Sequence, residues 1–274
     1  MTAIMILNMM ANMNKSVLVT GASTGIGAVY ADRFAKRGHD LILVARNNDR
    51  LEALAGRLHH ENGVAVDVIQ ADLTNETDLQ KVEARLRDDA QIGILVNNAG
   101  MSIAGKFPDQ SASDITSLIN LNAVAVTRLA LAATPSFLAA GEGAMINLGS
   151  VLGLVPDFGS TVYGATKAFV LYLSQALHSQ LGPQGIYVQA VLPAVTRTEI
   201  WERSGKNVND MPGIMEVEEL VDAALVGFDR RETVTIPPLH DAEQWMTFDA
   251  ARQAMAPNFL QGRAAPRYRT LSTP

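Results

Sequence analysis

The sequence contains no cysteine, few aromatic residues and no long run of lysine and arginine. Without cysteine, the chain cannot form disulfides, thiolate nucleophiles or cysteine metal sites. The histidines are scattered except for His59 and His60, which as neighbours point to different faces of any helix, so no metal site is predicted. A net charge of −6 and a pI near 5.4 argue against a nucleic-acid partner. No stretch resembles the ~20 apolar residues of a membrane span, so no membrane partner is expected.

The 274 residues, 48% of them hydrophobic, are enough to bury the core of one α/β domain. We expect this domain to span 15–256. Residues 1–14 lack the charged start and small-residue cleavage site of a signal peptide, and are expected to form a disordered extension. The tail 257–274 is rich in proline and arginine, and is expected to be poorly ordered unless a partner subunit holds it. The expected compartment is the cytoplasm.

Short apolar runs alternate with helical patterns along the chain. Strands are predicted at 17–20, 41–44, 64–70, 92–96, 144–148, 186–192 and 233–236. Helices are predicted at 28–37, 49–58, around 79–86, 114–133, 163–181 and 216–228. This alternation implies right-handed βαβ crossovers. The predicted fold is therefore α/β: a doubly wound Rossmann fold with a central, parallel, seven-stranded sheet flanked by helices on both faces.

A glycine-rich turn joins the first predicted strand to the first helix. In Thr20-Gly-Ala-Ser-Thr-Gly-Ile-Gly, Gly21 permits a sharp turn, Gly25 lets backbone approach a phosphate, and Gly27 allows the helix to pack closely on the sheet. The helix N-terminus offers free N–H groups to a pyrophosphate. The turn therefore predicts dinucleotide binding by Gly21, Ser23, Thr24, Gly25, Ile26 and Gly27.

The end of the second strand carries Ala45 and Arg46 and no carboxylate. An NAD site typically places Asp or Glu there, bonded to the ribose 2′-hydroxyl. An arginine can instead hold a 2′-phosphate through charge-assisted, bidentate hydrogen bonds. Arg46 therefore favours NADP(H) over NAD(H), although a solvent-facing arginine at the start of the next helix is the alternative.

Tyr163 and Lys167 lie four residues apart, and Ser150 precedes the tyrosine by thirteen. Residues i and i+4 share one face of a helix, so a phenol and an ammonium can lie side by side. A nearby ammonium lowers the pKa of a phenol from its ordinary value of ~10, so Tyr163 could exchange a proton with an alcohol or carbonyl. The alternative for this pair alone is a half-buried tyrosine beside a solvated lysine.

Taken together, these motifs resemble the short-chain dehydrogenase/reductase family over residues 16–200. The family's glycine turn reads 20–27, its Asn-Asn-Ala-Gly signature reads 97–100, and its Tyr-x-x-x-Lys pair is Tyr163 and Lys167. One departure from the family pattern is Pro193-Ala194, where Pro-Gly is usual, and we expect Ala194 to reshape the backbone near the nicotinamide. Ala45-Arg46 resembles the NADP-preferring members.

The resemblance implies roles for individual residues. Tyr163 would be the general acid for carbonyl reduction and the base for alcohol oxidation. Lys167 would lower its pKa and bind the nicotinamide ribose, Ser150 would hold the substrate oxygen, and Asn122 would position a water on the proton path. The further cofactor contacts that it implies are Asp72, Leu73, Asn98, Ala99, Gly100, Pro193, Val195 and Thr198.

The predicted function is hydride transfer between NADP(H) and a carbonyl or alcohol substrate, with Tyr163 as general acid and base. The alternatives are NADP-dependent oxidation of short 3-hydroxy acids, and a non-catalytic NADP(H)-binding sensor. Residues 194–215 are long and irregular enough to form a substrate lid. Apolar residues that could line the substrate pocket are Met101, Leu152, Val155, Phe158 and Trp201. The resemblance also implies a homo-tetramer or homo-dimer formed through the long helices.

Overall fold

A computed structural model describes residues 15–199 and 207–269. It divides the chain into two units, with the boundary between Pro237 and Pro238. The predicted extension 1–14 lies outside the described residues. The first compact unit ends at Pro237. The limits expected for the domain, 15–256, stay a prediction.

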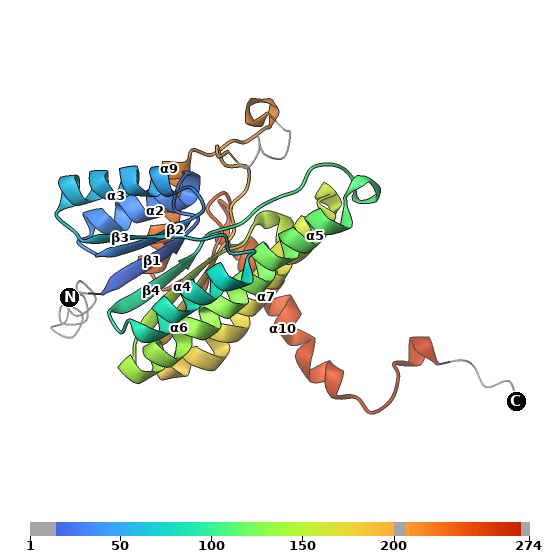
Figure 1. Cartoon of the computed structure of the whole chain (residues 1–274). Helices are drawn as coiled ribbons and strands as arrows, with labels where there is room; N and C mark the ends of the chain where they lie inside the picture. Colours follow the sequence, from blue (N-terminus) through green and yellow to red (C-terminus); the bar gives the residue numbers. More distant parts are fainter. Residues whose placement is uncertain (1–14, 200–206, 270–274) are drawn as a thin grey trace, which may run out of the picture. The chain divides into compact units, whose positions relative to one another are not determined.

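The first unit is built on a seven-stranded sheet, and every described strand pair is parallel. The strands are β1 (Ser16–Thr20), β2 (Leu41–Ala45), β3 (Val66–Gln70), β4 (Ile92–Asn97), β5 (Gly143–Leu148), β6 (Ile186–Val191) and β7 (Val234–Thr235). Their spatial order is β3-β2-β1-β4-β5-β6-β7 (Figure 1). This arrangement confirms the predicted doubly wound Rossmann fold.

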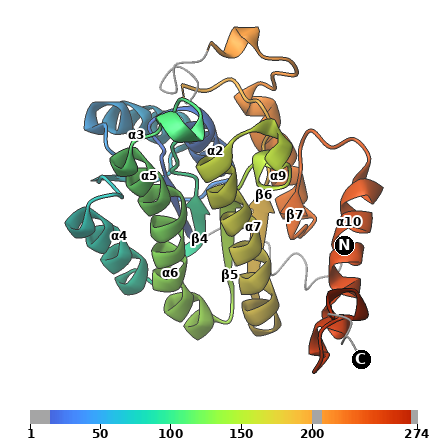
Figure 2. The same cartoon turned by 90° about the vertical axis from the view of Figure 1, so that its right-hand side faces the viewer.

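Helices cover both faces of the sheet (Figures 1 and 2). One layer contains α2 (Gly25–Lys36), α3 (Asn48–Asn62) and α9 (Val217–Asp229). The other contains α4 (Glu76–Asp88), α5 (Ala112–Ile119), α6 (Val126–Ala140) and α7 (Thr161–Leu181). Short helical turns connect these elements: η1 (Phe107–Asp109), η3 (Val151–Gly153), η4 (Pro156–Phe158), η5 (Gly182–Gln184) and η6 (Val208–Asp210).

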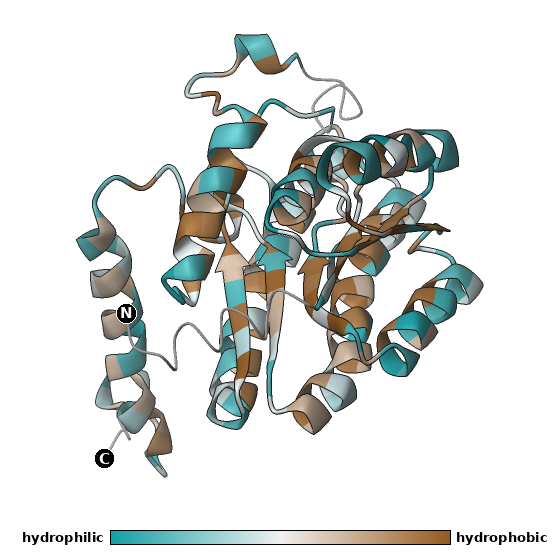
Figure 3. Ribbon diagram, turned by 90° about the vertical axis from the view of Figure 1, so that its left-hand side faces the viewer, coloured by the Kyte–Doolittle hydropathy of each residue, from teal (hydrophilic) through white to brown (hydrophobic). Residues whose placement is uncertain are grey.

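The core has two halves because successive residues of a strand point to opposite faces. In β1, Val17 and Val19 join the cluster that packs with α2, α3 and α9, whereas Leu18 joins the cluster with α4 and α6. In Figure 3 the strands between the two helix layers are mostly apolar, whereas the helices alternate between hydrophilic and hydrophobic residues. Burial on both faces explains the continuous apolar runs in the sequence.

Capping residues set the ends of α3. The Asn47 side chain accepts a hydrogen bond from the backbone N–H of Arg50 at the start of the helix. Gly63 ends it in the left-handed conformation, with φ of 72° and open space around its Cα. The helix is therefore longer than the predicted 49–58.

The helical stretch Ala112–Ala140 corrects the expectation that nothing in the sequence resembles a membrane span. It consists of α5, the π-helical turn η2 (Asn120–Ala125) and α6, and it is long and apolar enough to cross a membrane by length and composition alone. Core helices of soluble proteins meet the same criterion. Here Leu118 is buried, and Leu129 and Phe137 pack in the core beside the sheet, which accounts for the apolar composition.

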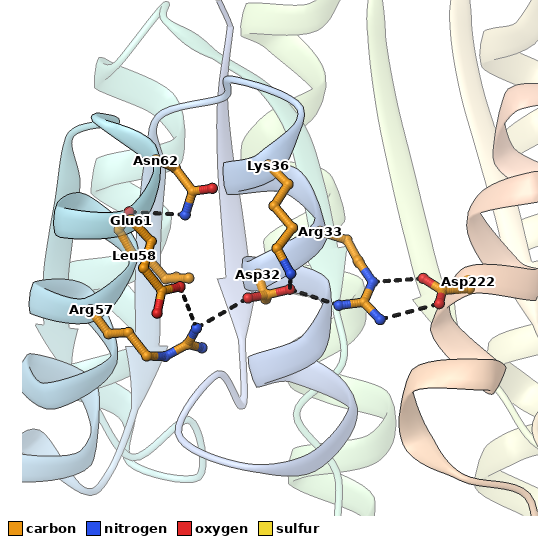
Figure 4. Close-up of polar contacts among 8 residues, drawn as sticks. All are labelled: Asp32, Arg33, Lys36, Arg57, Leu58, Glu61, Asn62 and Asp222. Carbon is orange, nitrogen blue, oxygen red and sulfur yellow. Dashed lines mark hydrogen bonds and ion pairs between the residues drawn. The ribbon is translucent and has the colours of Figure 1, made fainter.

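A network of ion pairs joins the helices of the first layer (Figure 4). Asp32 of α2 accepts hydrogen bonds from Arg33 and Lys36, both at 2.7 Å, and from Arg57 of α3 at 3.2 Å. Arg33 also donates to Asp222 of α9 at 2.7 Å. Burial acts to raise the pKa of Asp32, but hydrogen bonds from the three cations outweigh it, so this pKa is lowered. The network therefore ties α2 to α3 and α9 around an ionised carboxylate.

The second unit contains α10 (Ala242–Ala254), η7 (Ala256–Leu260) and η8 (Pro266–Tyr268). Asp241 caps α10 by accepting a hydrogen bond from the backbone N–H of Glu243. No described residue of this unit is buried.

Candidate active site

A cleft of about 390 Å³ opens at the carboxyl ends of the strands. Its lining residues follow β1, β2, β3, β4, β5 and β6. In the sheet, β1 lies between β2 and β4, so the chain reverses its direction of winding there. Ligands of open α/β sheets bind at such a switch point.

The glycine turn forms the floor of this cleft. Gly21 and Gly25 have φ values of 66° and 55°, which favour glycine. Gly27 is required for a different reason, because a Cβ there would lie 2.4 Å from the carbonyl oxygen of Gly21. Five of the six predicted turn residues line the cleft, namely Gly21, Ser23, Thr24, Gly25 and Ile26, whereas Gly27 packs beneath them.

Thr20 fixes the turn to the end of β4. Its hydroxyl accepts hydrogen bonds from the backbone N–H groups of Asn98 and Ala99, each at 3.0 Å. The Asn98 amide in turn donates to the carbonyls of Thr20 and Gly21, at 2.9 and 3.2 Å. Thr20 is the first residue of the glycine motif, and its role in supporting the turn could not be predicted from the sequence.

At the β2 and β3 end, the cleft is lined by Arg46, Asp72 and Leu73, as predicted for an adenosine site. The Asp72 carboxylate accepts from both the N–H and the hydroxyl of Thr74, at 2.9 and 2.7 Å, which fixes its orientation. The Arg46 side chain is exposed, and no hydrogen bond or ion pair joins its guanidinium to another residue within 15–199 or 207–269. Arg46 is thus available to an anion.

An ion pair that the sequence does not predict crosses this part of the cleft. Arg50 of α3 donates to both carboxylate oxygens of Glu199, at 2.9 and 3.1 Å. Both residues line the cleft, although they are 149 positions apart in the chain. The pair links the wall after β2 to the wall after β6.

Ser150, Tyr163 and Lys167 lie together at the β5 and β6 end of the cleft. Ser150 follows β5, and its hydroxyl donates to the Pro193 carbonyl at 3.3 Å. Tyr163 and Lys167 share one face of α7, with the ammonium 5.6 Å from the centroid of the phenol ring. Lys167 is only 6% exposed, and it donates to the Leu148 carbonyl at 2.7 Å.

The electrostatics of this pair differ from the sequence-based expectation. Burial raises the pKa of Tyr163 to about 12, and a hydrogen bond with Ser150 offsets this only in part. Burial also lowers the pKa of Lys167 to about 8. The Lys167 ammonium donates to a backbone carbonyl, and desolvation of the phenol raises the Tyr163 pKa, which is the opposite direction to the one predicted.

Asn122 lies in η2, and its side chain holds the backbone after β4. Its amide donates to the Met101 carbonyl and accepts from the Met101 N–H, both at 2.9 Å. It also donates to the Thr166 hydroxyl at 3.2 Å. π-helical turns are frequent at functional sites. The structure thus shows a positioning role for Asn122, while its role in holding a water stays a prediction.

The segment after β6 closes the remaining wall. Pro193, Ala194, Thr196 and Thr198 line the cleft, and the Thr198 methyl would lie 3.3 Å from a Cβ at Gly25. Val195 is not among the lining residues, because its carbonyl turns away to accept a hydrogen bond from the backbone N–H of Met215 at 2.9 Å.

The predicted lid is only partly described. Its two ends pair through a bridge between Thr196 and Met215, and residues 200–206, with Trp201, lie outside the described residues. Of the apolar residues predicted for the substrate pocket, Met101 lines this cleft. The other three described candidates, Leu152, Val155 and Phe158, do not.

Comparison with known proteins agrees with this geometry. The family described as short chain dehydrogenase matches residues 15–209. The chain is 62% identical to a short-chain dehydrogenase from Sphingobium yanoikuyae solved in complex with NADPH, with a TM-score of 0.92. That match covers 93% of this chain and 100% of the other.

Two further relatives differ in what they act on. A bulky-bulky ketone specific alcohol dehydrogenase from Comamonas testosteroni is 55% identical, with a TM-score of 0.87, over 93% of this chain and 99% of the other. A very-long-chain 3-oxoacyl-CoA reductase from Bos taurus is 35% identical over 67% of this chain. The match spans only 60% of the length of that curated relative.

Proposed function

The chain belongs to the short-chain dehydrogenase/reductase family, and from this we propose that it is an NADP(H)-dependent oxidoreductase acting on carbonyl and alcohol groups. One observation carries the proposal. Ser150, Tyr163 and Lys167 line the same cleft as the glycine turn and Arg46. A protein that only bound the dinucleotide would not need the whole set of Ser150, Tyr163 and Lys167.

The residues present fit a dinucleotide phosphate. The N-terminus of α2 and the glycine turn would hold the pyrophosphate. A Cβ at Gly21 or Gly27 would collide with neighbouring atoms, so the backbone of this turn requires glycine at both positions. Asp72 and Leu73 would contact the adenosine, Arg46 the 2′-phosphate, and Lys167 the nicotinamide ribose. NADPH was present in the Sphingobium structure, which supports this choice.

When bound, the nicotinamide supplies or accepts the hydride. The protein's own part is to move one proton and to orient the substrate. Tyr163 would donate its phenolic proton to the carbonyl oxygen during reduction and recover it during oxidation. Ser150 would hold that same oxygen. Lys167 would stabilise the phenolate that results, since it lies on the same helical face.

The catalytic end of the cleft favours an uncharged substrate. Among the described lining residues at this end, Lys167 is the one that carries a charge, and the apolar ones are Ala99, Met101, Leu121, Leu148, Pro193 and Ala194. A short 3-hydroxy acid would need a second cation for its carboxylate. A ketone with two large apolar substituents fits better, and the likeness to the Comamonas enzyme supports this substrate class.

A substrate panel tests the proposed activity. We expect steady NADPH oxidation with ketones that carry two large substituents, and rates at least about tenfold lower for the NADP-dependent oxidation of 3-hydroxybutyrate. The measurement is the loss of absorbance of the reduced nicotinamide, with a 3-oxoacyl thioester included as a third substrate class. If the protein binds NADPH but none of the three classes is turned over, the sensor alternative holds instead.

Replacing Arg46 by alanine tests the cofactor preference. A charge-assisted contact contributes about 1.5–3 kcal/mol, so kcat/KM for NADPH should fall about 10- to 100-fold while the value for NADH changes little. Arg57→Ala is the matched control, since Arg57 lies outside the cleft and pairs with Asp32 and Glu61. An equal loss with both cofactors would contradict the proposed 2′-phosphate contact.

The same proposal includes a homo-oligomer, a dimer or tetramer, in the cytoplasm. The outer face of α6 and α7 exposes large apolar side chains, among them Leu131, Phe169 and Tyr172. Exposed apolar patches of this kind mark interaction surfaces. They support association through the long helices.

A further inference from the structure

The segment after β6 reaches across the cleft to the opposite wall. In the sheet, β1, β4 and β5 lie between β2 and β6, yet Glu199 after β6 contacts Arg50 of α3, the helix that follows β2. On the way this segment passes close to the glycine turn, because the Thr198 methyl would lie 3.3 Å from a Cβ at Gly25. The Arg50–Glu199 ion pair therefore crosses the cleft that both residues line.

Each end of this ion pair is held by its own hydrogen bonds. On one wall, the backbone N–H of Arg50 donates to the Asn47 side chain at 3.0 Å, which fixes the start of α3. On the other wall, Arg197 lies two residues before Glu199, and its guanidinium donates to the Glu216 carboxylate at 2.9 Å. The pair thus connects two walls that are positioned independently of each other.

The exposure of the pair allows it to open and close. The side chains of Arg50 and Glu199 are 49% and 37% exposed. An ion pair exposed to this extent is weak, because water and salt screen its charges, so it breaks and forms again readily. A ligand can therefore enter the cleft while the pair is open and be retained while it is closed.

Arg50 keeps donors for an anion while it is paired. One nitrogen, Nη1, donates to both carboxylate oxygens of Glu199, at 2.9 and 3.1 Å. Within 15–199 and 207–269, the Nε and Nη2 atoms of Arg50 donate to no other residue. A phosphate in the cleft can approach these donors without displacing the carboxylate. The arrangement favours a pair that stays closed over a ligand, rather than a carboxylate that competes with the ligand for Arg50.

We propose that Arg50 and Glu199 form a strap across the cleft, which closes once NADP(H) is bound and slows its release. The inference rests on the proposed NADP(H)-dependent function and adds the two residues that set the lifetime of the complex. Glu199 contributes by closing the strap, so its effect is the same for NADPH and NADH. In this it differs from Arg46, whose proposed contact is with the 2′-phosphate.

Dissociation rates in single and double variants test the strap. We expect Arg50→Gln and Glu199→Gln each to raise the dissociation rate of NADPH about fivefold, because either substitution breaks the pair. The double variant should release NADPH no faster than Arg50→Gln alone. Glu199→Gln should raise the dissociation rate of NADH by the same factor. The rates are measured by stopped-flow fluorescence while excess NADP⁺ displaces the reduced cofactor.

Asp229→Asn is the matched control. It breaks the Arg37–Asp229 ion pair, which is also exposed but lies outside the cleft, so the dissociation rate should not change. Slower release from Glu199→Gln would show that Glu199 competes with the cofactor, and unchanged release or additive effects would show that the two residues act separately. Each of these results would overturn the strap while the proposed function stands. If wild type itself does not bind NADPH, both proposals are wrong.

The lack of cysteine allows the strap to be closed covalently. Arg50→Cys with Glu199→Cys places one thiol on each wall of the cleft, and a short bis-maleimide joins them. Cross-linking after loading with NADPH should slow its release at least about tenfold relative to the same variant before cross-linking. Cross-linking of the empty protein should slow NADPH entry in the same way. Equal rates before and after cross-linking would overturn the proposal.

Discussion

Replacing Tyr163 by phenylalanine is expected to lower kcat for ketone reduction by about a thousandfold, while NADPH binding changes by less than about twofold. The substitution removes only the hydroxyl, and thus the proton that the reduced carbonyl oxygen must receive. The ring remains to pack beside the Lys167 ammonium, 5.6 Å from its centroid. Binding is measured by NADPH fluorescence, and turnover by single-substrate kinetics.

Tyr172→Phe provides the matched control for this experiment. Tyr172 lies on the same helix but is 74% exposed and does not line the cleft. We expect kcat and NADPH binding to be unchanged in that variant. Undiminished turnover in Tyr163→Phe would show that another group donates the proton.

Replacing Lys167 by methionine is expected to have opposite effects on activity and on stability. Turnover should fall at least about a hundredfold, because the charge that stabilises the phenolate is lost. Stability at neutral pH should rise. The pKa of Lys167 is lowered from 10.5 to about 8 by burial, so the ionised lysine destabilises the folded protein by up to roughly 3 kcal/mol. The lost hydrogen bond to Leu148 makes the net gain smaller.

The stability difference between Lys167→Met and wild type is expected to depend on pH. Between about pH 8 and 10.5 the unfolded state binds more protons at this lysine than the folded state does. Lys167 therefore destabilises the folded protein by the full amount below about pH 8, and this destabilisation decreases as the pH rises towards 10.5. The stability advantage of Lys167→Met should thus shrink between pH ~7 and pH ~10 in urea unfolding. Lys81→Met, an exposed lysine on α4, should show no such change.

The fold and the catalytic pair could be predicted because their signals are local. The glycine turn follows a buried strand directly, and Tyr163 and Lys167 are one helical turn apart. The helix predicted at 114–133 shows the limit of this reasoning. The prediction ends at residue 133, yet α6 continues through Pro135 to Ala140, and Phe137 in this last part packs in the core.

Features that join distant segments could not be predicted. The Arg50–Glu199 ion pair spans 149 positions, and no pattern in the sequence connects the two residues. The high pKa of Tyr163 depends on its burial, which spacing along a helix does not report. The π-helical turn at Asn122 arises where the side chain bonds to the backbone of Met101, and neither glycine nor proline marks it.

Gly63 and Gly27 differ in how much evolutionary change they tolerate. At Gly63 the backbone is left-handed but the surroundings are empty, so asparagine, which tolerates this conformation, is an accessible substitution. At Gly27 even a single methyl group meets the carbonyl oxygen of Gly21. Residue 63 at the end of α3 can therefore change by neutral drift, whereas purifying selection is expected to retain glycine at residue 27 below the cleft.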